Sequence, residues 1–84
     1  MPTLILYTKP DCGLCDEAQD AIDRVRANVP FELHVVDISA DDELAERYGQ
    51  RIPVVLVDGE EAFEYEVDEG ELTGRIEAAA GASG

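Results

Sequence analysis

The chain has 84 residues, enough for one small domain with a modest core and too few for a second domain. With 45% apolar and 31% charged residues, its composition is that of a globular protein rather than of a disordered or membrane protein. Twenty acidic residues against six basic ones give a formal net charge of -14, which argues against nucleic acid and anionic membranes as partners, because their phosphates would be repelled.

The N-terminal part of the chain predicts a buried strand followed by a helix. Residues 3–8, TLILYT, are almost continuously apolar and β-prone, as in a central strand, and Pro10 ends this run. The run is too short for a signal peptide or a membrane span, and no positive charge precedes it, so we expect a cytoplasmic protein. Residues 13–28 then carry one apolar stripe at helical spacing, and Pro30 ends this helix. The stripe consists of Leu14, Ala18, Ala21, Ile22 and Val25.

A second strand is predicted at residues 31–38, FELHVVDI. Phe31, Leu33 and Val35 alternate toward the core, which places His34 on the opposite, exposed face. A strand, a helix and a strand in this order predict a right-handed parallel crossover.

A short helix is predicted within residues 39–49, SADDELAERYG. Ser39 and Asp42 have the spacing of a capping box, which indicates where the helix begins. Gly49 can supply a left-handed cap at its C-terminal end.

Residues 53–67 predict an antiparallel hairpin. Two β-rich runs flank Asp58 and Gly59, where a tight turn needs the positive φ that glycine supplies. The second run exposes its glutamates to solvent. The residues that it buries are Phe63, Tyr65 and Val67.

Asp68 and Glu71 form a second capping pattern, which predicts a last helix. We therefore expect one α/β domain over residues 1–80 with the order β-α-β-α-β-β-α, in which helices flank a four-stranded mixed sheet. Residues 81–84 are expected to form a flexible C-terminal tail.

The motif CGLC at residues 12–15 holds the only two cysteines of the chain, where the first strand is followed by the first helix. A helix N-terminus carries free N–H groups and partial positive charge, which stabilise a thiolate, the attacking form of cysteine. Cys12 is therefore the candidate nucleophile. Cys15 lies one helical turn later on the same side, within reach of a sulfur bonded to Cys12, and is the candidate resolving thiol.

Other roles of the cysteine pair have less physical support. A disulfide between residues this close closes so short a loop that it stabilises the fold by roughly 2 kcal/mol in the entropic model. Structural zinc sites are almost always four-coordinate, and the chain offers only the two cysteines and His34, so we expect no metal within one chain. The alternatives that remain are a metal or iron-sulfur centre held between two chains and a non-enzymatic redox-sensing or adaptor module.

The stretch YTKPDCGLC after a buried strand, followed by RIPVVLVDG in a hairpin, resembles the glutaredoxins. The small size and plain ending resemble the little-characterised glutaredoxin-like branch of the thioredoxin superfamily. The resemblance covers nearly the whole chain. It implies a thioredoxin-like fold and a monomeric dithiol-disulfide oxidoreductase that acts on disulfides of proteins or small molecules and holds no bound cofactor.

Four further residues gain candidate roles from this resemblance. Pro53 matches the family's cis proline that faces the cysteines, and the backbone of Ile52 before it would pair with an extended substrate. Lys9 matches a lysine near the nucleophile, where a cation favours the thiolate and attracts a carboxylate of glutathione. Arg51 is a second candidate for the same role.

The chain departs from the glutaredoxin pattern where that family holds the γ-glutamyl end of glutathione. A glycine pair is typical there, whereas Tyr65 and Glu66 stand at this place in the stretch YEVDEG and add bulk and negative charge. Asp11, Asp16 and Glu17 add further carboxylates around the cysteines. We therefore expect weak use of glutathione as co-substrate and an electron donor of the thioredoxin-reductase type.

The charge of -14, with Lys9 as the only lysine, resembles the composition of proteins from salt-loving organisms. We predict that the midpoint of thermal unfolding rises by at least about 5 °C between low salt and molar salt, which corresponds to roughly 1 kcal/mol for a domain of this size. The physical reason is that salt screens the mutual repulsion of the carboxylates. Circular dichroism over a salt series measures the midpoint, and a midpoint that does not move would contradict a salt-adapted origin.

Overall fold

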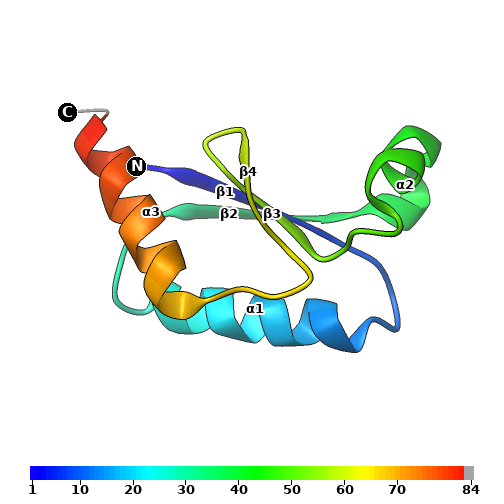
Figure 1. Cartoon of the computed structure of the whole chain (residues 1–84), viewed down its shortest axis with the longest axis horizontal. Helices are drawn as coiled ribbons and strands as arrows, with labels where there is room; N and C mark the ends of the chain where they lie inside the picture. Colours follow the sequence, from blue (N-terminus) through cyan, green and yellow to red (C-terminus); the bar gives the residue numbers. More distant parts are fainter. Residues whose placement is uncertain (83–84) are drawn as a thin grey trace.

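A computed structural model of the chain describes residues 1–82. Its strands and helices follow the predicted order, with an additional 3-10 turn after the second strand (Figure 1). The elements are β1 (Thr3–Thr8), α1 (Gly13–Arg26), β2 (Glu32–Asp37), η1 (Ile38–Ala40), α2 (Asp42–Tyr48), β3 (Val54–Val57), β4 (Glu60–Glu64) and α3 (Glu69–Ala82).

The strands form one mixed four-stranded sheet in the order β2-β1-β3-β4. β1 pairs in parallel with β2, where Leu4 lies opposite Leu33, and antiparallel with β3, where Leu4 lies opposite Val57. β3 pairs antiparallel with β4. The predictions of a central first strand, a parallel second strand and a β3–β4 hairpin are therefore confirmed.

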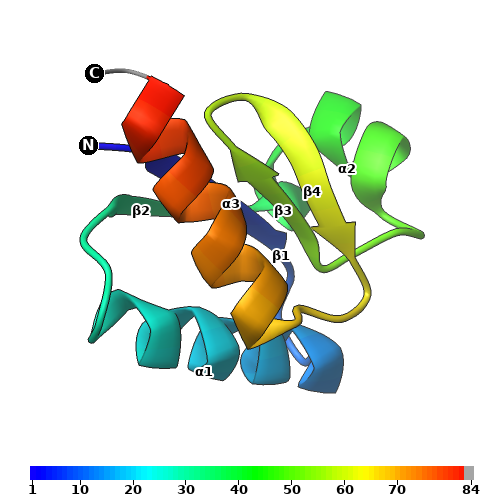
Figure 2. The same ribbon diagram turned by 60° about the vertical axis from the view of Figure 1, so that its left-hand side comes forward.

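Each face of the sheet has its own apolar cluster, because successive side chains of a strand point to opposite faces. Leu6 of β1 packs on the face that α1 and α3 cover, in one cluster with Ile22 and Ile76. Tyr7, the next residue, lies in the cluster of the other face and stacks on Tyr48 of α2, with ring centroids 4.5 Å apart. Figures 1 and 2 show α1 and α3 against each other and α2 apart from both.

The β3–β4 hairpin turns at Asp58 and Gly59, as predicted. Their φ values are 50° and 86°, both in the left-handed region that a tight hairpin turn of this kind requires. Oδ1 of Asp58 accepts a hydrogen bond from the backbone N–H of Thr3 (2.9 Å), which ties the turn to the start of β1.

The expected burial of Tyr65 is wrong, because β4 ends at Glu64, before the predicted end at residue 67. Tyr65 has a φ of 69°, which a strand residue does not adopt, and its side chain is 47% exposed. Its N–H donates to the carbonyl oxygen of Pro53 (2.9 Å) and closes the open end of the hairpin. Phe63 and Val67 are partly buried, as expected.

The expected burial of Val35 is also wrong. Its side chain is 45% exposed, because β2 is an edge strand with a neighbour on one side only. Phe31 is buried and His34 is exposed, as predicted.

The start of α2 differs from the predicted capping box of Ser39 and Asp42. The N-cap is Asp41, whose carboxylate accepts hydrogen bonds from two N–H groups of the first turn. Ser39 lies in η1 instead and donates its N–H and its hydroxyl to Asp37. Gly49 has a right-handed φ of -54°, so the prediction of a left-handed cap is wrong as well.

α3 begins at the predicted cap, since Oδ1 of Asp68 accepts a hydrogen bond from the N–H of Glu71 (2.9 Å). The helix continues to Ala82 and so includes the first two residues of the predicted 81–84 tail; residues 83–84 lie outside the described part of the chain. None of the helices in residues 1–82 has the length and apolar character needed to cross a membrane.

Candidate active site

Cys12 is the N-cap residue of α1. Its backbone is extended (φ -112°, ψ 107°), and its Sγ accepts a hydrogen bond from the backbone N–H of Cys15 at 3.2 Å. The sulfur therefore lies where a helix N-terminus presents free N–H groups and partial positive charge. The side chain is partly exposed, so a substrate sulfur can approach it.

The chain reverses direction directly before Cys12, at Asp11. Asp11 has a φ of 58°, in the left-handed region where aspartate is one of the more frequent residues other than glycine. This turn lets the chain leave the end of β1 and enter α1 at once, which places Cys12 at the start of the helix.

Cys15 is buried, with 2% of its surface exposed, on the first turn of α1. Burial, followed by the interaction of its thiol with the side chain of Cys12, raises the pKa of Cys15 above its ordinary value. The Thr8 hydroxyl and the Lys9 backbone act in the opposite direction without reversing this shift. The two cysteines are therefore unequal. The sulfur of Cys12 is accessible at the end of the helix, whereas Cys15 is buried and its raised pKa favours the protonated thiol.

Sequence reasoning missed Thr8 as a site residue. It is the last residue of β1, and its side chain acts to lower the pKa of the Cys15 thiol, against the larger effect of burial. The available signal was a hydroxyl side chain at the end of an otherwise apolar strand, directly before the cysteine motif.

Ile52 and Pro53 lie just before β3, and both are buried. The peptide bond between them is cis, as the resemblance implies. Ile52 belongs to the same apolar cluster as Cys15, against which Cys12 packs. Within residues 1–82, the backbone N–H and C=O of Ile52 take part in no hydrogen bond.

The two candidate cations differ in their partners. Arg51 is held by β4: its Nε donates to Glu64 (2.9 Å) and its Nη2 donates to Glu61. These carboxylates, Glu64 first, raise the pKa of Arg51, and the guanidinium also lies over the ring of Tyr48 at 5.5 Å. Lys9 is exposed and, within residues 1–82, forms no ion pair. Of the two, Lys9 alone has a charge that is available to a substrate.

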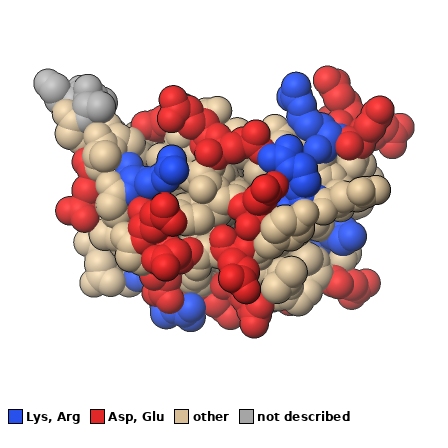
Figure 3. All heavy atoms as spheres, in the orientation of Figure 1, with Lys and Arg blue, Asp and Glu red and all other residues tan. Residues whose placement is uncertain are grey.

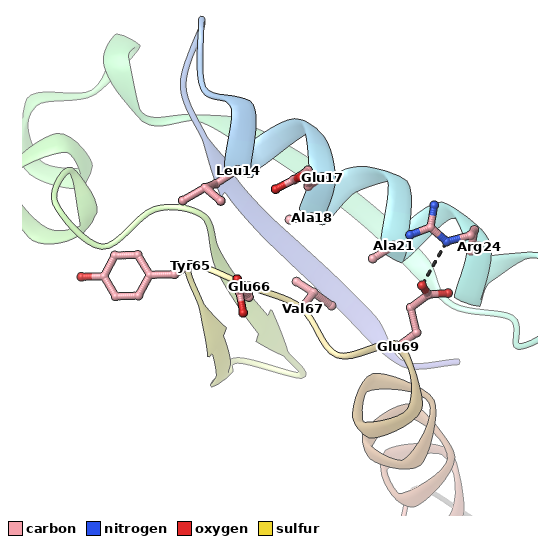
Figure 4. Close-up of a pocket in the computed structure, with 9 residues that line it drawn as sticks. All are labelled: Leu14, Glu17, Ala18, Ala21, Arg24, Tyr65, Glu66, Val67 and Glu69. Carbon is pink, nitrogen blue, oxygen red and sulfur yellow. Dashed lines mark hydrogen bonds and ion pairs between the residues drawn. The ribbon is translucent and has the colours of Figure 1, made fainter.

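A groove of about 240 Å³ lies between α1 and the segment that joins β4 to α3 (Figure 4). It begins at Leu14, which stands between the two cysteines in the sequence, and ends at the ion pair of Arg24 with Glu69 (3.0 Å). The other residues that line it are Glu17, Ala18, Ala21, Tyr65, Glu66 and Val67.

In the described part of the chain, residues 1–82, no three His, Cys, Asp or Glu side chains come together as a metal-binding group. His34 is on β2 and is exposed. A metal held by Cys12 and Cys15 would therefore need ligands from another molecule.

Comparison with known proteins identifies similar sequences and folds. The model of the family described as glutaredoxin-like domain (DUF836) matches residues 3–77. An uncharacterized protein of Mycobacterium tuberculosis is 29% identical over 80 residues, which are 89% of this chain and 82% of that protein. An X-ray structure of a structural-genomics target from X. campestris is 32% identical, has a TM-score of 0.73 and is matched over 89% of this chain and 96% of that one. A thioredoxin from Halobacterium salinarum shares the fold alone, with 24% identity, a TM-score of 0.68 and coverage of 92% and 73%.

We predict that Cys15 titrates above the ordinary thiol pKa of about 8.5, because burial disfavours its thiolate. In a Cys12→Ser variant, the rate of alkylation by iodoacetamide as a function of pH follows Cys15 alone, and its burial remains. The same variant unfolded in urea is the control. An inflection in the folded protein at or below that of the control would contradict the prediction.

The same shift predicts how stability depends on pH. The pKa of Cys15 is higher in the folded than in the unfolded chain, so the protonated thiol stabilises the fold. This stabilisation is fully present below the pKa of the unfolded chain and is lost as the pH rises through the pKa of the folded chain. In urea unfolding of the Cys12→Ser variant, the free energy of unfolding should therefore decrease as the pH is raised above 8. In a Cys12→Ser/Cys15→Ser variant, the same rise in pH should decrease the free energy of unfolding by less.

Proposed function

The chain belongs to the glutaredoxin-like domain family of the thioredoxin superfamily, and from this membership and the geometry of its cysteines we propose that it is a small dithiol-disulfide oxidoreductase. One observation carries the proposal: the sulfur of Cys12 accepts the N–H of Cys15 at the start of α1, while Cys15 is buried behind it. A partly exposed sulfur at a helix N-terminus is suited to attack a disulfide first, and its protonated neighbour is suited to attack that sulfur later and release the substrate.

In the proposed reaction, the thiolate of Cys12 attacks one sulfur of a substrate disulfide. The substrate's disulfide bond breaks, a mixed disulfide with Cys12 forms, and the first substrate thiol leaves. Cys15 then loses its proton, attacks the sulfur of Cys12 and releases the second substrate thiol. The protein ends with a Cys12–Cys15 disulfide, and the substrate has gained two electrons and two protons. A dithiol donor reverses these steps on the protein.

The segment before β3 has free backbone groups with which an extended substrate could form hydrogen bonds. The backbone groups of Ile52 are free of hydrogen bonds within residues 1–82, and the side chain packs in the cluster that contains Cys15. We propose that a substrate strand pairs with the backbone of Ile52, with Pro53 fixing its direction, so that its disulfide lies over Cys12.

We propose a second dithiol protein, of the thioredoxin-reductase type, as electron donor in place of glutathione. Glutathione is anionic, and of the two candidate cations Arg51 is already bound to Glu61 and Glu64. Tyr65 has the left-handed backbone that a glycine favours, which fits the place of the family's glycine pair, but it adds an exposed ring there. Lys9 alone opposes this negative and crowded surface.

We propose that the protein performs this reaction in the cytoplasm, as a monomer, on disulfides of proteins or small molecules. A reducing compartment keeps the cysteine pair in the dithiol form that begins the reaction. The proposed steps use the two thiols and need no bound cofactor.

Replacement of Cys12 by Ser is expected to abolish disulfide reduction, because no sulfur then remains at the helix end to attack. Replacement of Cys15 by Ser is expected to leave the attack intact and to trap the protein as a mixed disulfide with its substrate. Insulin reduction and non-reducing mass spectrometry measure the two effects, with circular dichroism as the folding control. Equal loss in both variants without a trapped species would refute these roles.

Glutathione is expected to be a poor donor: turnover of a small mixed disulfide with glutathione and glutathione reductase should be at least about tenfold slower than turnover with a thioredoxin-reductase system, a difference of roughly 1.4 kcal/mol in barrier. The assay compares the wild type with the Cys15→Ser variant. Rapid turnover of that variant with glutathione would mean that Cys12 alone suffices, and the dithiol donor would be wrong.

A further inference from the structure

The groove beside the cysteine motif has an acidic rim. Among its lining residues are three glutamates and one arginine, Arg24, and the guanidinium of Arg24 is already paired with Glu69. Glu17 and Glu66 have no ion-pair partner within residues 1–82. Both line the groove and are exposed, so it has carboxylates that no cation of the described chain neutralises.

The groove also has an apolar side. Leu14 is 42% exposed and Tyr65 is 47% exposed, and they are two of the four large hydrophobic residues that are exposed in residues 1–82. In Figure 4 Leu14 lies at the end of the groove opposite the Arg24–Glu69 pair, whereas the ring of Tyr65 points away from the groove, and its hydroxyl donates to the carbonyl oxygen of Gln50 (3.2 Å). Because contact with an apolar group removes this surface from water, a ligand that covers it gains affinity.

The length of the groove suits a piece of polypeptide. From Leu14 to Arg24 the groove follows α1 for about 15 Å, at 1.5 Å per helical residue. An extended chain spans this length with roughly four or five residues. A small disulfide would cover only one end.

We propose that the groove binds the residues that flank the disulfide in a substrate protein, while the disulfide itself lies over Cys12, and that the groove selects flanking segments with basic residues. This inference rests on the proposed function and adds to it the class of substrate. The basic side chains meet Glu17 and Glu66, and an apolar neighbour of the cysteine covers Leu14. The observation that selects this partner is charge complementarity with the unpaired carboxylates of the groove.

The net negative charge of the whole molecule attracts any cationic ligand. Its effect on the reaction rate has to be distinguished from the effect of contacts inside the groove. Figure 3 shows acidic side chains over much of the face that includes the groove. A long-range field speeds the approach of every basic ligand, whereas a contact in the groove acts only on a ligand bound there. Replacement of one glutamate by lysine changes the net charge equally at every position, so two positions can be compared directly.

The test uses the full-length reduced protein and two five-residue peptides, each joined by a disulfide to the same neutral thiol. One peptide has arginines beside its cysteine and the other has glutamates. Stopped-flow rates at low ionic strength are divided by the rate with hydroxyethyl disulfide, a neutral substrate that is too small to fill the groove. The variants are Glu66→Lys and, as the matched control, Glu46→Lys; Glu46 is an exposed residue of α2 outside the groove.

For the wild type, the arginine peptide should react at least about fivefold faster than the glutamate peptide, since one close charge pair in water contributes about 1 kcal/mol. In Glu66→Lys this ratio should decrease at least about fivefold, while in Glu46→Lys it should stay within about twofold of the wild type. Equal rates for the two peptides in the wild type, or equal decreases in the two variants, would overturn the proposal.

A binding measurement separates this proposal from the proposed function. Fluorescence anisotropy with the same two peptides, with serine in place of cysteine, reports occupancy of the groove without any exchange. If no disulfide reacts, the oxidoreductase assignment fails, and selective binding of the arginine peptide that is lost in Glu66→Lys still supports a groove for basic segments. Absence of this selectivity in the binding measurement overturns the groove proposal.

Discussion

The hydrogen bond from the backbone N–H of Cys15 to the sulfur of Cys12 is the interaction on which the candidate site depends. It exists because α1 begins directly after Cys12, and α1 begins there because the chain turns at Asp11 as soon as β1 ends. The pairing of β1 with a strand on each side fixes the point from which this turn starts. The sheet thereby determines which of the two sulfurs is accessible from solvent.

Much of the fold could be predicted because local patterns and tertiary packing agree. The apolar run of β1, the Asp58–Gly59 turn and the Asp68 cap each form what their sequence alone favours. The failures are positions whose environment depends on distant parts of the chain. Alternation in β2 predicts that Val35 is buried, but alternation does not show that β2 lies at the edge of the sheet.

The candidate site was predictable to a similar extent and for the same reason. The proposed roles of Cys12 and Cys15 follow from their spacing at a strand-to-helix junction, whereas Pro53 was identified only through the resemblance to a family. Residue spacing does not indicate that Arg51 pairs with β4, or that a groove follows α1 away from the cysteines. Such features arise where side chains from separate elements meet.

The negative charge of the chain affects whether a second molecule can pair with the free edge of β2. An unpaired strand edge offers N–H and C=O groups to any other strand, and Val35 adds an apolar side chain to that edge. Glu32 and Asp37, at the two ends of β2, are both exposed. A second copy of the chain that tried to extend the sheet there would bring like charges together, whether the strands ran parallel or antiparallel. The exposed carboxylates of Glu32 and Asp37 thus oppose pairing between two copies of the chain at this edge.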